Sequence, residues 1–341
     1  MPIDTAKRVL HLRYKKNQQV MRNVARLWHI EKSVTTEQQL LEHLHPWGEA
    51  RDLKFHNGLS FFIGILGASW LFFGWFLRHL ISFPLCFVIG WVLIFIAYIS
   101  YETDDPIRSV IKFLEQRMVQ LRYGVQFGGL PSHLPPNTQS VYLLSRVKNL
   151  FPLFDQGTQS SQIQCYAVTD WHVGDQTYPV LIFEYTYATE VSTEDEDGDR
   201  VVIKTMQKTA WGAFIFEVPA LGIAISNRRK NFDEPYTERW HSSDILLSQQ
   251  LKIYGIDAIQ NAKYLSPSLT LKLEQFFQHF KGDLIFHADE SIACYVGERD
   301  LFAVHSKKNK IQEISDLRGH LRTLSMLNYE KFRKLMQNIL S

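Results

Sequence analysis

Cysteine is scarce in this chain of 341 residues, which contains three. Cys86 lies inside an apolar run, whereas Cys165 and Cys294 lie in strand-like stretches. None of them has a neighbouring cysteine or the spacing of a zinc site. Such a sparse, odd-numbered set does not form a disulfide framework and fits a reducing compartment. The apolar surroundings of Cys165 and Cys294 predict unreactive core thiols.

The common catalytic and cofactor-binding motifs are also missing. The sequence contains no G-x-x-x-x-G-K-[ST], no G-x-G-x-x-G after a strand, no G-x-S-x-G and no H-E-x-x-H. We therefore assign no catalytic, cofactor-binding or metal-binding residue and expect no cofactor. Missing motifs weigh only weakly against an enzyme, because active sites are recognised by geometry.

Histidines and charged runs give few further candidates. His43 and His45 fall on opposing sides of a predicted helix, which argues against joint metal binding. His279 and His287 could approach each other through folding, but two lone histidines are more often structural. The acidic run Glu194–Asp199 does not fit an EF-hand loop, because its glycine is misplaced and no glutamate closes the site. A solvated hairpin tip explains this run better.

Nucleic acid is not an expected partner. The net charge is +2, so no global basic excess is present. The basic run Asn227–Lys230 has no aromatic residues interleaved with it for base stacking.

Two long uncharged apolar runs dominate the sequence. The first, Leu59–Leu77, has nineteen residues and the second is Ile81–Tyr101. At about 1.5 Å of rise per residue, each helix would nearly match the roughly 30 Å hydrocarbon core of a bilayer. A buried helical hairpin in a soluble core is the alternative, but a soluble helix normally keeps a polar face. The runs therefore predict a transmembrane hairpin.

Flanking charges predict the orientation of this hairpin. Ten Lys and Arg residues precede the first run, against six acidic residues, and Arg108, Lys112, Arg117 and Arg122 follow the second. Arg78 alone lies between the runs. Because cytoplasmic flanks carry the positive excess, both termini should be cytoplasmic. We expect a protein of the cytoplasmic (inner) membrane with two spans, for which the lipid bilayer is one partner.

Small residues recur within the runs at a spacing of four. Ser60, Gly64 and Ala68 form one stripe, and Cys86 and Gly90 form another. Such stripes let helices approach closely in lipid. Packing of the two helices on each other is favoured over dimerisation of two chains.

The N-terminal segment 4–30 has an amphipathic helical pattern with two readings. Arg8, Lys15, Arg22 and Arg26 align on one face, opposite an apolar face that includes Val24. Leu10, Tyr14, Met21 and Trp28 complete the apolar face. The helix could lie on an anionic membrane surface. Its apolar stripe could equally pack on protein.

Four parts follow from this pattern. Residues 1–57 hold cytoplasmic amphipathic helices, including one capped by Thr36, and residues 58–101 hold the hairpin. Residues 102–137 hold a stalk helix and the linker Gly128–Asn137, and residues 138–341 form a cytoplasmic domain.

Alternation of apolar residues predicts antiparallel strands in the last part. The stretches Gln162–Trp171, Tyr178–Val191 and Val201–Phe216 have a period of two, and Asp197-Gly198 joins the last two as a hairpin. Gly212 suggests a bulge. Later segments alternate short strands with helices, and two amphipathic helices end the chain. The predicted fold class is α+β.

Four segments of the C-terminal half carry a resemblance: F-I-F-E-V-P-A-L at Phe214–Leu221, L-K-I-Y-G-I-D at Leu251–Asp257, Y-L-S-P-S-L at Tyr264–Leu269 and D-L-I-F-H-A-D-E-S-I-A-C-Y-V at Asp283–Val296. Together with the predicted membrane hairpin, they resemble a family of bacterial membrane proteins of unknown function. The resemblance implies two transmembrane helices and a cytoplasmic α+β domain, and it implies no catalytic residues. The acidic hairpin at Glu194–Asp199 and the basic N-terminal helix have no counterpart in it.

These features lead to three functional hypotheses. The first is a membrane-anchored binding or scaffold protein without catalytic activity, whose partner is another protein or a second copy of itself. The second is an enzyme acting on a lipid or envelope precursor at the inner leaflet, with residues such as His279, His287 and Asp289 converging. The third is a homo-oligomeric membrane assembly. A deep pocket lined by converging polar groups would favour the enzyme.

Overall fold

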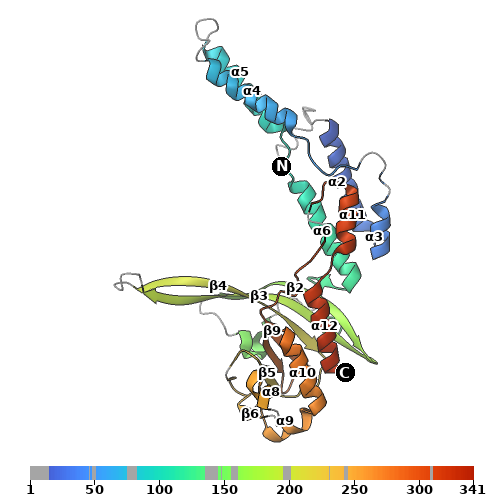
Figure 1. Cartoon of the computed structure of the whole chain (residues 1–341), viewed down its shortest axis with the longest axis vertical. Helices are drawn as coiled ribbons and strands as arrows, with labels where there is room; N and C mark the ends of the chain where they lie inside the picture. The colour runs from blue at the N-terminus through green and yellow to red at the C-terminus, as the bar shows by residue number, and fades with distance from the viewer. Residues whose placement is uncertain are drawn as a thin grey trace. The chain divides into compact units, whose positions relative to one another are not determined.

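The computed structural model describes most of the chain, in two compact units (Figure 1). The described residues are 15–45, 47, 51–74, 83–134, 145–146, 148–154, 160–194, 201–229, 231–241, 245–307 and 310–341. Unit 1 comprises Met1–Leu121 and Ser306–Leu324, and unit 2 comprises Arg122–His305 and Ser325–Ser341. The segment 306–324, which we expected in the C-terminal domain, thus belongs to unit 1.

Unit 1 is built from helices. They are α2 (Lys15–Ser33), α3 (Glu37–His43), α4 (Gly58–Gly74), α5 (Phe83–Ser100), α6 (Asp105–Tyr123, of which 105–121 belong to this unit) and α11 (Ile314–Thr323). The starts follow from local chemistry. The Thr36 hydroxyl accepts from the Gln39 amide at 3.2 Å to cap α3, and Pro106 lies in the first turn of α6, where proline is tolerated.

The amphipathic helices of unit 1 bury their apolar stripes against one another. Leu27, Leu40, Val110, Leu114 and Leu317 are all essentially inaccessible. The ring of Trp28 on α2 lies 4.9 Å from that of Phe113 on α6. The apolar face of α2 therefore packs on protein, which is the second of the two readings, whereas residues 4–14 lie outside the described part. Helix α6 is likewise a core helix of this unit and not a bare stalk.

Helices α4 and α5 lie side by side and run antiparallel. A Cβ added to Gly67 would lie 3.0 Å from the carbonyl oxygen of Gly90, and Gly64 faces Ala97. The helices thus pack on each other through small residues, as expected, although the stripe differs in detail. Gly67 takes part in the contact, and Ala68 is exposed. At the base of the pair, Asn57 exchanges two hydrogen bonds with the backbone of Glu102, at 2.7 and 3.1 Å.

Outside this seam, α4 and α5 expose large apolar side chains. The most exposed are Phe61 at 70%, Phe72 at 67% and Tyr98 at 66%. Among the described residues, one helical stretch, Pro84–Tyr123, is long and apolar enough to cross a membrane by length and composition. Only 22% of its apolar window is buried. The stretch Gly58–Phe73 is also an apolar helix but is shorter.

Unit 2 contains an antiparallel sheet of nine strands. In spatial order these are β1 (Gln126–Phe127), β2 (Ser160–Val173), β3 (Gln176–Glu194), β4 (Val201–Phe216), β9 (Ile292–Gly297), β8 (Gly282–Phe286), β5 (Ile223–Ser226), β7 (Lys252–Gly255) and β6 (Glu238–Trp240). Its helical elements are η2 (Pro152–Phe154), α8 (Ile245–Gln250), α9 (Ala258–Tyr264), α10 (Pro267–His279) and α12 (Leu327–Leu340). This mixed helix and sheet architecture agrees with the predicted antiparallel α+β class.

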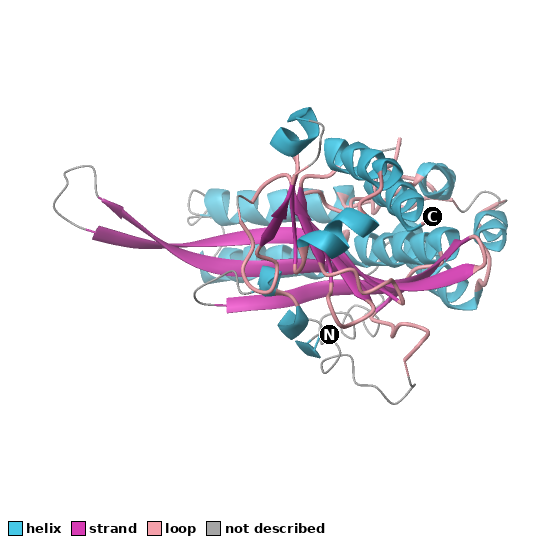
Figure 2. Ribbon diagram, turned by 90° about the horizontal axis from the view of Figure 1, so that it is seen from below, coloured by secondary structure: helices cyan, strands magenta, loops and turns pink. Residues whose placement is uncertain are grey.

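The two faces of the sheet carry separate apolar layers. One layer joins alternate residues of β3, β4 and β9, including Phe183, Phe214 and Cys294, to Phe151 and Phe154. The opposite face packs on α10 and α12. There the Tyr295 ring lies 5.1 Å from Phe332 and 5.3 Å from Phe276. Figure 2 shows the long strands β3 and β4 continuing outward past their shorter neighbours.

Gly212 does not mark the bulge that we predicted. The pairing of β3 with β4 is continuous through Phe183 and Gly212, and the register shift lies instead in β2, between Ile163 and Cys165. A Cβ at position 212 would lie 2.1 Å from the carbonyl oxygen of Tyr295. The glycine therefore permits close approach of the neighbouring strand.

Other differences concern short or partly described segments. Strands β1 and β6 have two and three residues, too few for a visible alternation. Gly128, the expected start of a linker, has a φ of 67° and donates to the Tyr166 carbonyl at the sheet edge. The acidic tip after Glu194 and part of the helix expected over Ser140–Phe154 lie outside the described residues.

Candidate functional site

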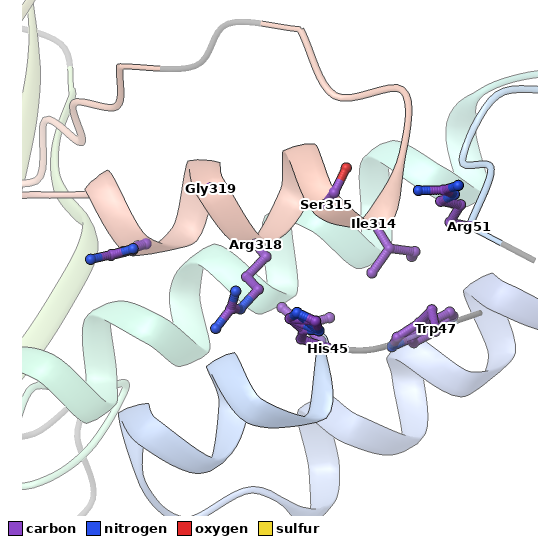
Figure 3. A pocket seen from close by; sticks show the side chains of 9 residues that line it. His45, Trp47, Arg51, Ile314, Ser315, Arg318 and Gly319 are labelled. Carbon is purple, nitrogen blue, oxygen red and sulfur yellow. The ribbon is translucent and has the colours of Figure 1, made fainter. Parts of the chain in front are cut away.

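A pocket of about 460 Å³ lies in unit 1 beside α11 (Figure 3). It is formed by residues that follow α3 and by residues from the first to the last turn of α11. Its lining residues are Leu44, His45, Trp47, Arg51, Ile314, Ser315, Arg318, Gly319 and Arg322. In Figure 3, Arg318 extends from α11 toward α3, and His45, Trp47 and Arg51 lie further along.

Backbone pairing joins the two segments that form the pocket. The Leu53 amide donates to the Gln312 carbonyl at 2.7 Å, and the Ile314 amide donates to the Arg51 carbonyl at 2.9 Å. A capping box between Glu313 and Asp316 fixes the start of α11. Segments about 260 positions apart in the sequence are therefore held next to each other.

The lining of the pocket is basic. Three of its residues are arginines, one is a histidine, and none is acidic. Arg318 donates its Nε to the carbonyl of Leu41 at 3.0 Å, which fixes the direction of the guanidinium. Among the described residues, its two terminal nitrogens have no hydrogen-bond or ionic partner, and the Arg51 side chain has none either. The pocket therefore offers uncompensated guanidinium donors, which suit an anion.

The base of the pocket is apolar and well fixed. Leu44 and Ile314 are 2% and 1% exposed. The indole Nε1 of Trp47 donates to the carbonyl of His43 at 2.8 Å, and the Arg26 guanidinium stacks 4.1 Å from the Trp47 ring centre. A ligand entering the pocket would therefore meet cationic groups together with buried apolar surface.

The pocket has no arrangement typical of catalysis. The hydroxyl of Ser315 donates to the carboxylate of Glu313 at 3.4 Å, within the first turn of α11. That contact is part of the helix start and does not couple Ser315 to a histidine. The guanidinium groups of the described lining can bind and orient an anion. The pocket therefore favours ligand binding over catalysis.

A smaller pocket of about 240 Å³ lies in unit 2. It is lined by His133, Leu134, Arg146, Phe216, Glu217, Glu290, Ser291 and Ile292. Arg146 forms an ion pair with Glu290 at 3.2 Å, and burial lowers the pKa of His133, whose ring lies 4.6 Å from Phe216. Glu217 adopts a φ of 62°, an unusual conformation for a residue with a side chain. The volume lies below the roughly 300 Å³ of common ligand pockets.

His279, His287 and Asp289 do not converge. His279 ends α10, before β8, whereas His287 follows β8. A strand of five residues separates the two histidines, and it spans about 16 Å. The His287 Nδ1 accepts from the amides of Asp289 and Glu290 at 3.1 and 2.9 Å, which makes it a turn-forming residue. The set proposed for the enzyme hypothesis is therefore not assembled.

The cysteines and metal-binding candidates also lack a reactive arrangement in the described part of the chain. Cys294 is fully buried, and burial raises the pKa of its thiol well above the ordinary value. Burial raises the pKa of Cys165 as well. No group of three or more His, Cys, Asp or Glu residues among those described could hold a metal ion.

Arg228 and Arg229 of the basic run Asn227–Lys230 bind a buried carboxylate, a role that the sequence did not reveal. Asp283 is inaccessible and accepts from Ser226 at 2.6 Å, Arg228 at 3.1 Å and Arg229 at 2.8 Å. Burial tends to lower the pKa of Arg228, but the charge and hydrogen bond of Asp283 outweigh it and raise that pKa. These contacts join β5 to β8 and are structural.

Comparisons with known proteins do not identify this chain. No family model, no curated protein and no solved structure matches it. The resemblance to a bacterial membrane protein family therefore stays an expectation.

The pocket beside α11 was not predicted from the sequence. Its residues come from 44–51 and 314–322, and neither segment carries a recognisable motif. Arg318 and Arg322 are spaced by four and so share one helix face, which was the only local signal.

Proposed function

We propose that this protein is a membrane-anchored binding protein, held in the cytoplasmic membrane by α4 and α5 with both termini in the cytoplasm. The observation that carries this proposal is the exposed apolar surface of the helix pair. Phe61, Phe72, Phe95 and Tyr98 are each more than 60% exposed. A soluble monomer rarely exposes a contiguous apolar patch larger than a few hundred Å².

The dimensions of the helix pair fit a bilayer. The described parts of α4 and α5 have 17 and 18 residues, which correspond to about 26 Å of helix. The two apolar runs of the sequence extend past these ends and would bring each helix close to the roughly 30 Å hydrocarbon core. Neither helix contains a charged residue in these stretches.

The charge distribution supports the orientation. Lys and Arg residues concentrate before α4 and after α5, in α2 and α6. Cytoplasmic flanks are enriched in these residues, which supports the proposal that both flanks are cytoplasmic.

Binding is a better proposal than catalysis because of the two pockets. The larger one combines guanidinium donors with an apolar base, and the smaller one is only about 240 Å³. We also propose that the binding partner is another protein or a second copy of the chain.

Alkaline carbonate washing of membranes tests the anchor. We expect the full-length chain to stay in the membrane pellet, and a chain that is released quantitatively would contradict the proposal.

Orientation is tested with single cysteines in a variant in which the three native cysteines are replaced by alanine. We expect an impermeant thiol reagent to label Ser82→Cys, at the start of the second apolar run, from outside and not to label Ser341→Cys. The reverse pattern would show the opposite orientation.

A further inference from the structure

We infer that the pocket beside α11 binds the phosphate group of an organic phosphate monoester. This inference deepens the proposed binding function by naming a ligand class for unit 1. All residues that line the pocket belong to unit 1.

The charge of the pocket indicates an anion with more than one negative charge. Arg51, Arg318 and Arg322 contribute three permanent positive charges, because guanidinium groups do not deprotonate in proteins. None of the described lining residues is acidic, and the Arg51 side chain and the terminal nitrogens of Arg318 have no partner among the described residues. A phosphate monoester carries about two negative charges near neutral pH and three acceptor oxygens, so it can use several such donors at once.

The geometry of Arg318 favours a planar, bidentate contact. Its Nε is engaged with the carbonyl of Leu41 at 3.0 Å, which holds the guanidinium plane in place. Its two terminal nitrogens have no partner among the described residues. Because the side chain is already oriented, little rotational entropy is lost when an oxyanion is bound.

The volume and the base of the pocket indicate that the phosphate carries an organic group. A cavity of about 460 Å³ falls within the range of small-molecule sites and is much larger than a phosphate ion needs. Leu44 and Ile314 provide apolar surface, and Trp47 is fixed beside them by its bond to His43. An esterified carbon group would bury surface there, whereas inorganic phosphate would not.

The phosphate monoester can belong to a phospholipid headgroup or to a soluble compound. Two binding measurements distinguish these sources. Calorimetric titration of the full-length chain in neutral detergent uses inorganic phosphate and glycerol 3-phosphate as soluble probes. In a second arm, the chain is inserted into phosphatidylcholine nanodiscs with or without phosphatidic acid, and unit 1 is followed by hydrogen exchange of the α11 amides. A soluble source predicts that glycerol 3-phosphate binds more tightly than inorganic phosphate. A lipid source predicts protection of α11 only with phosphatidic acid.

Variants connect the binding to the pocket. Arg318→Gln combined with Arg322→Gln should weaken binding by at least about tenfold, because charge-assisted hydrogen bonds are lost. The matched control is Arg239→Gln, which removes one exposed arginine from β6 in unit 2 and should leave binding unchanged. Arg51→Gln is an independent variant that keeps the Arg318–Leu41 bond, in case the double variant fails to fold. It should also weaken binding.

Two outcomes would overturn the inference. One is the absence of binding for every probe, and the other is binding that the pocket variants leave unchanged. The carbonate wash gives a separate readout, since the pocket variants should remain in the membrane pellet. Loss of binding with retained membrane insertion therefore concerns the pocket alone, whereas release from the membrane would count against the anchor.

Discussion

Two regions of this molecule are almost equally apolar but have opposite surroundings. In β8 and β9, all eleven residues of the two strands are buried. In α4 and α5, the stretches are free of charge, yet large side chains such as Phe61 and Phe72 remain more than 65% exposed. The strands find their apolar surroundings within the chain, whereas the helices do not. An apolar sequence alone therefore does not determine whether protein or another medium covers it.

The cause lies in the geometry of each region. Strands β8 and β9 lie in the middle of a nine-strand sheet whose two faces are covered by aromatic layers. A pair of helices can bury only the seam between them, here through Gly67 and Gly90. The remaining circumference is left exposed, and under our proposal a bilayer covers it.

The largest expected effect concerns the buried charge of Asp283 in β8. Asp283→Ala should reduce the free energy of unfolding of unit 2 by about 3–4 kcal/mol, because Arg228 and Arg229 lose their buried counter-charge. Urea unfolding of the full chain, followed by hydrogen exchange of the sheet amides, measures this loss. Glu298→Gln is the control, since Glu298 is 63% exposed and contacts Arg228 at 3.5 Å. It should cost less than about 1 kcal/mol. Equal effects of the two variants would contradict a self-contained sheet core.

A slightly smaller effect should follow from filling the close approach in the sheet. In Gly212→Ala the new methyl group would meet the Tyr295 carbonyl oxygen, so β4 and β9 must separate. We expect a loss of about 3 kcal/mol, measured in the same way. The control is Gly58→Ala, where an added Cβ has open space. Retained stability in the sheet variant would show that the strands tolerate a side chain there.

The third prediction tests the helix side of the comparison. Val92→Arg places a charge near the middle of α5, and we expect it to disfavour membrane insertion by about 2.5 kcal/mol. The fraction of newly made chain that resists carbonate extraction measures this effect. Val304→Arg is the control, because Val304 is 44% exposed in unit 2 and its replacement should leave insertion unchanged. If both variants insert equally well, the exposed face of α5 is not in lipid.

The smallest effect concerns one buried hydrogen bond on the α12 face of the sheet. The Trp171 Nε1 donates to the hydroxyl of Tyr329 at 3.1 Å, and Tyr329→Phe would leave this buried donor without its partner. We expect a loss of about 1–2 kcal/mol in the free energy of unfolding. Tyr264→Phe, at a side chain that is 39% exposed, should be nearly neutral.

The same residue gives a pH dependence with a defined sign. Burial raises the pKa of Tyr329 above its ordinary value of 10.0, so the folded chain holds this proton more tightly than the unfolded chain. The contribution to stability is therefore present below pH 10 and is lost as the pH rises through the folded pKa. Unfolding measured across alkaline pH should be less steep in Tyr329→Phe than in the parent chain. An unchanged slope would mean that Tyr329 does not titrate in this range.

Local patterns predicted the elements of the fold well. Thr36 caps α3 as expected, and Asp257 and Ser266 cap α9 and α10 in the same way, because an N-cap depends on neighbours in sequence. Strand β4 has the predicted limits Val201–Phe216. The role of Gly212 was predicted wrongly, because the carbonyl that crowds it belongs to β9, more than 80 residues away in the chain.

The candidate site could not be predicted in the same way. Arg51 and Arg318 line the same pocket only because the segment 51–53 pairs with 312–314. The same holds for Asp283, whose partners Arg228 and Arg229 lie in a basic run that we considered, from the sequence, only as a nucleic-acid contact. Pairings between distant segments leave no periodic signal in either of them.

The sequence by itself determined the apolar character and length of the two runs, the caps, the alternating strands and the α+β class. Each of these depends on interactions within a few residues, where helical and strand periods are fixed by backbone geometry. Only the tertiary structure decided that 306–324 joins unit 1, that Asp283 is enclosed by arginines and that four basic side chains surround a pocket. The physical reason is that long-range packing brings together groups whose separation in sequence carries no information about their distance in space.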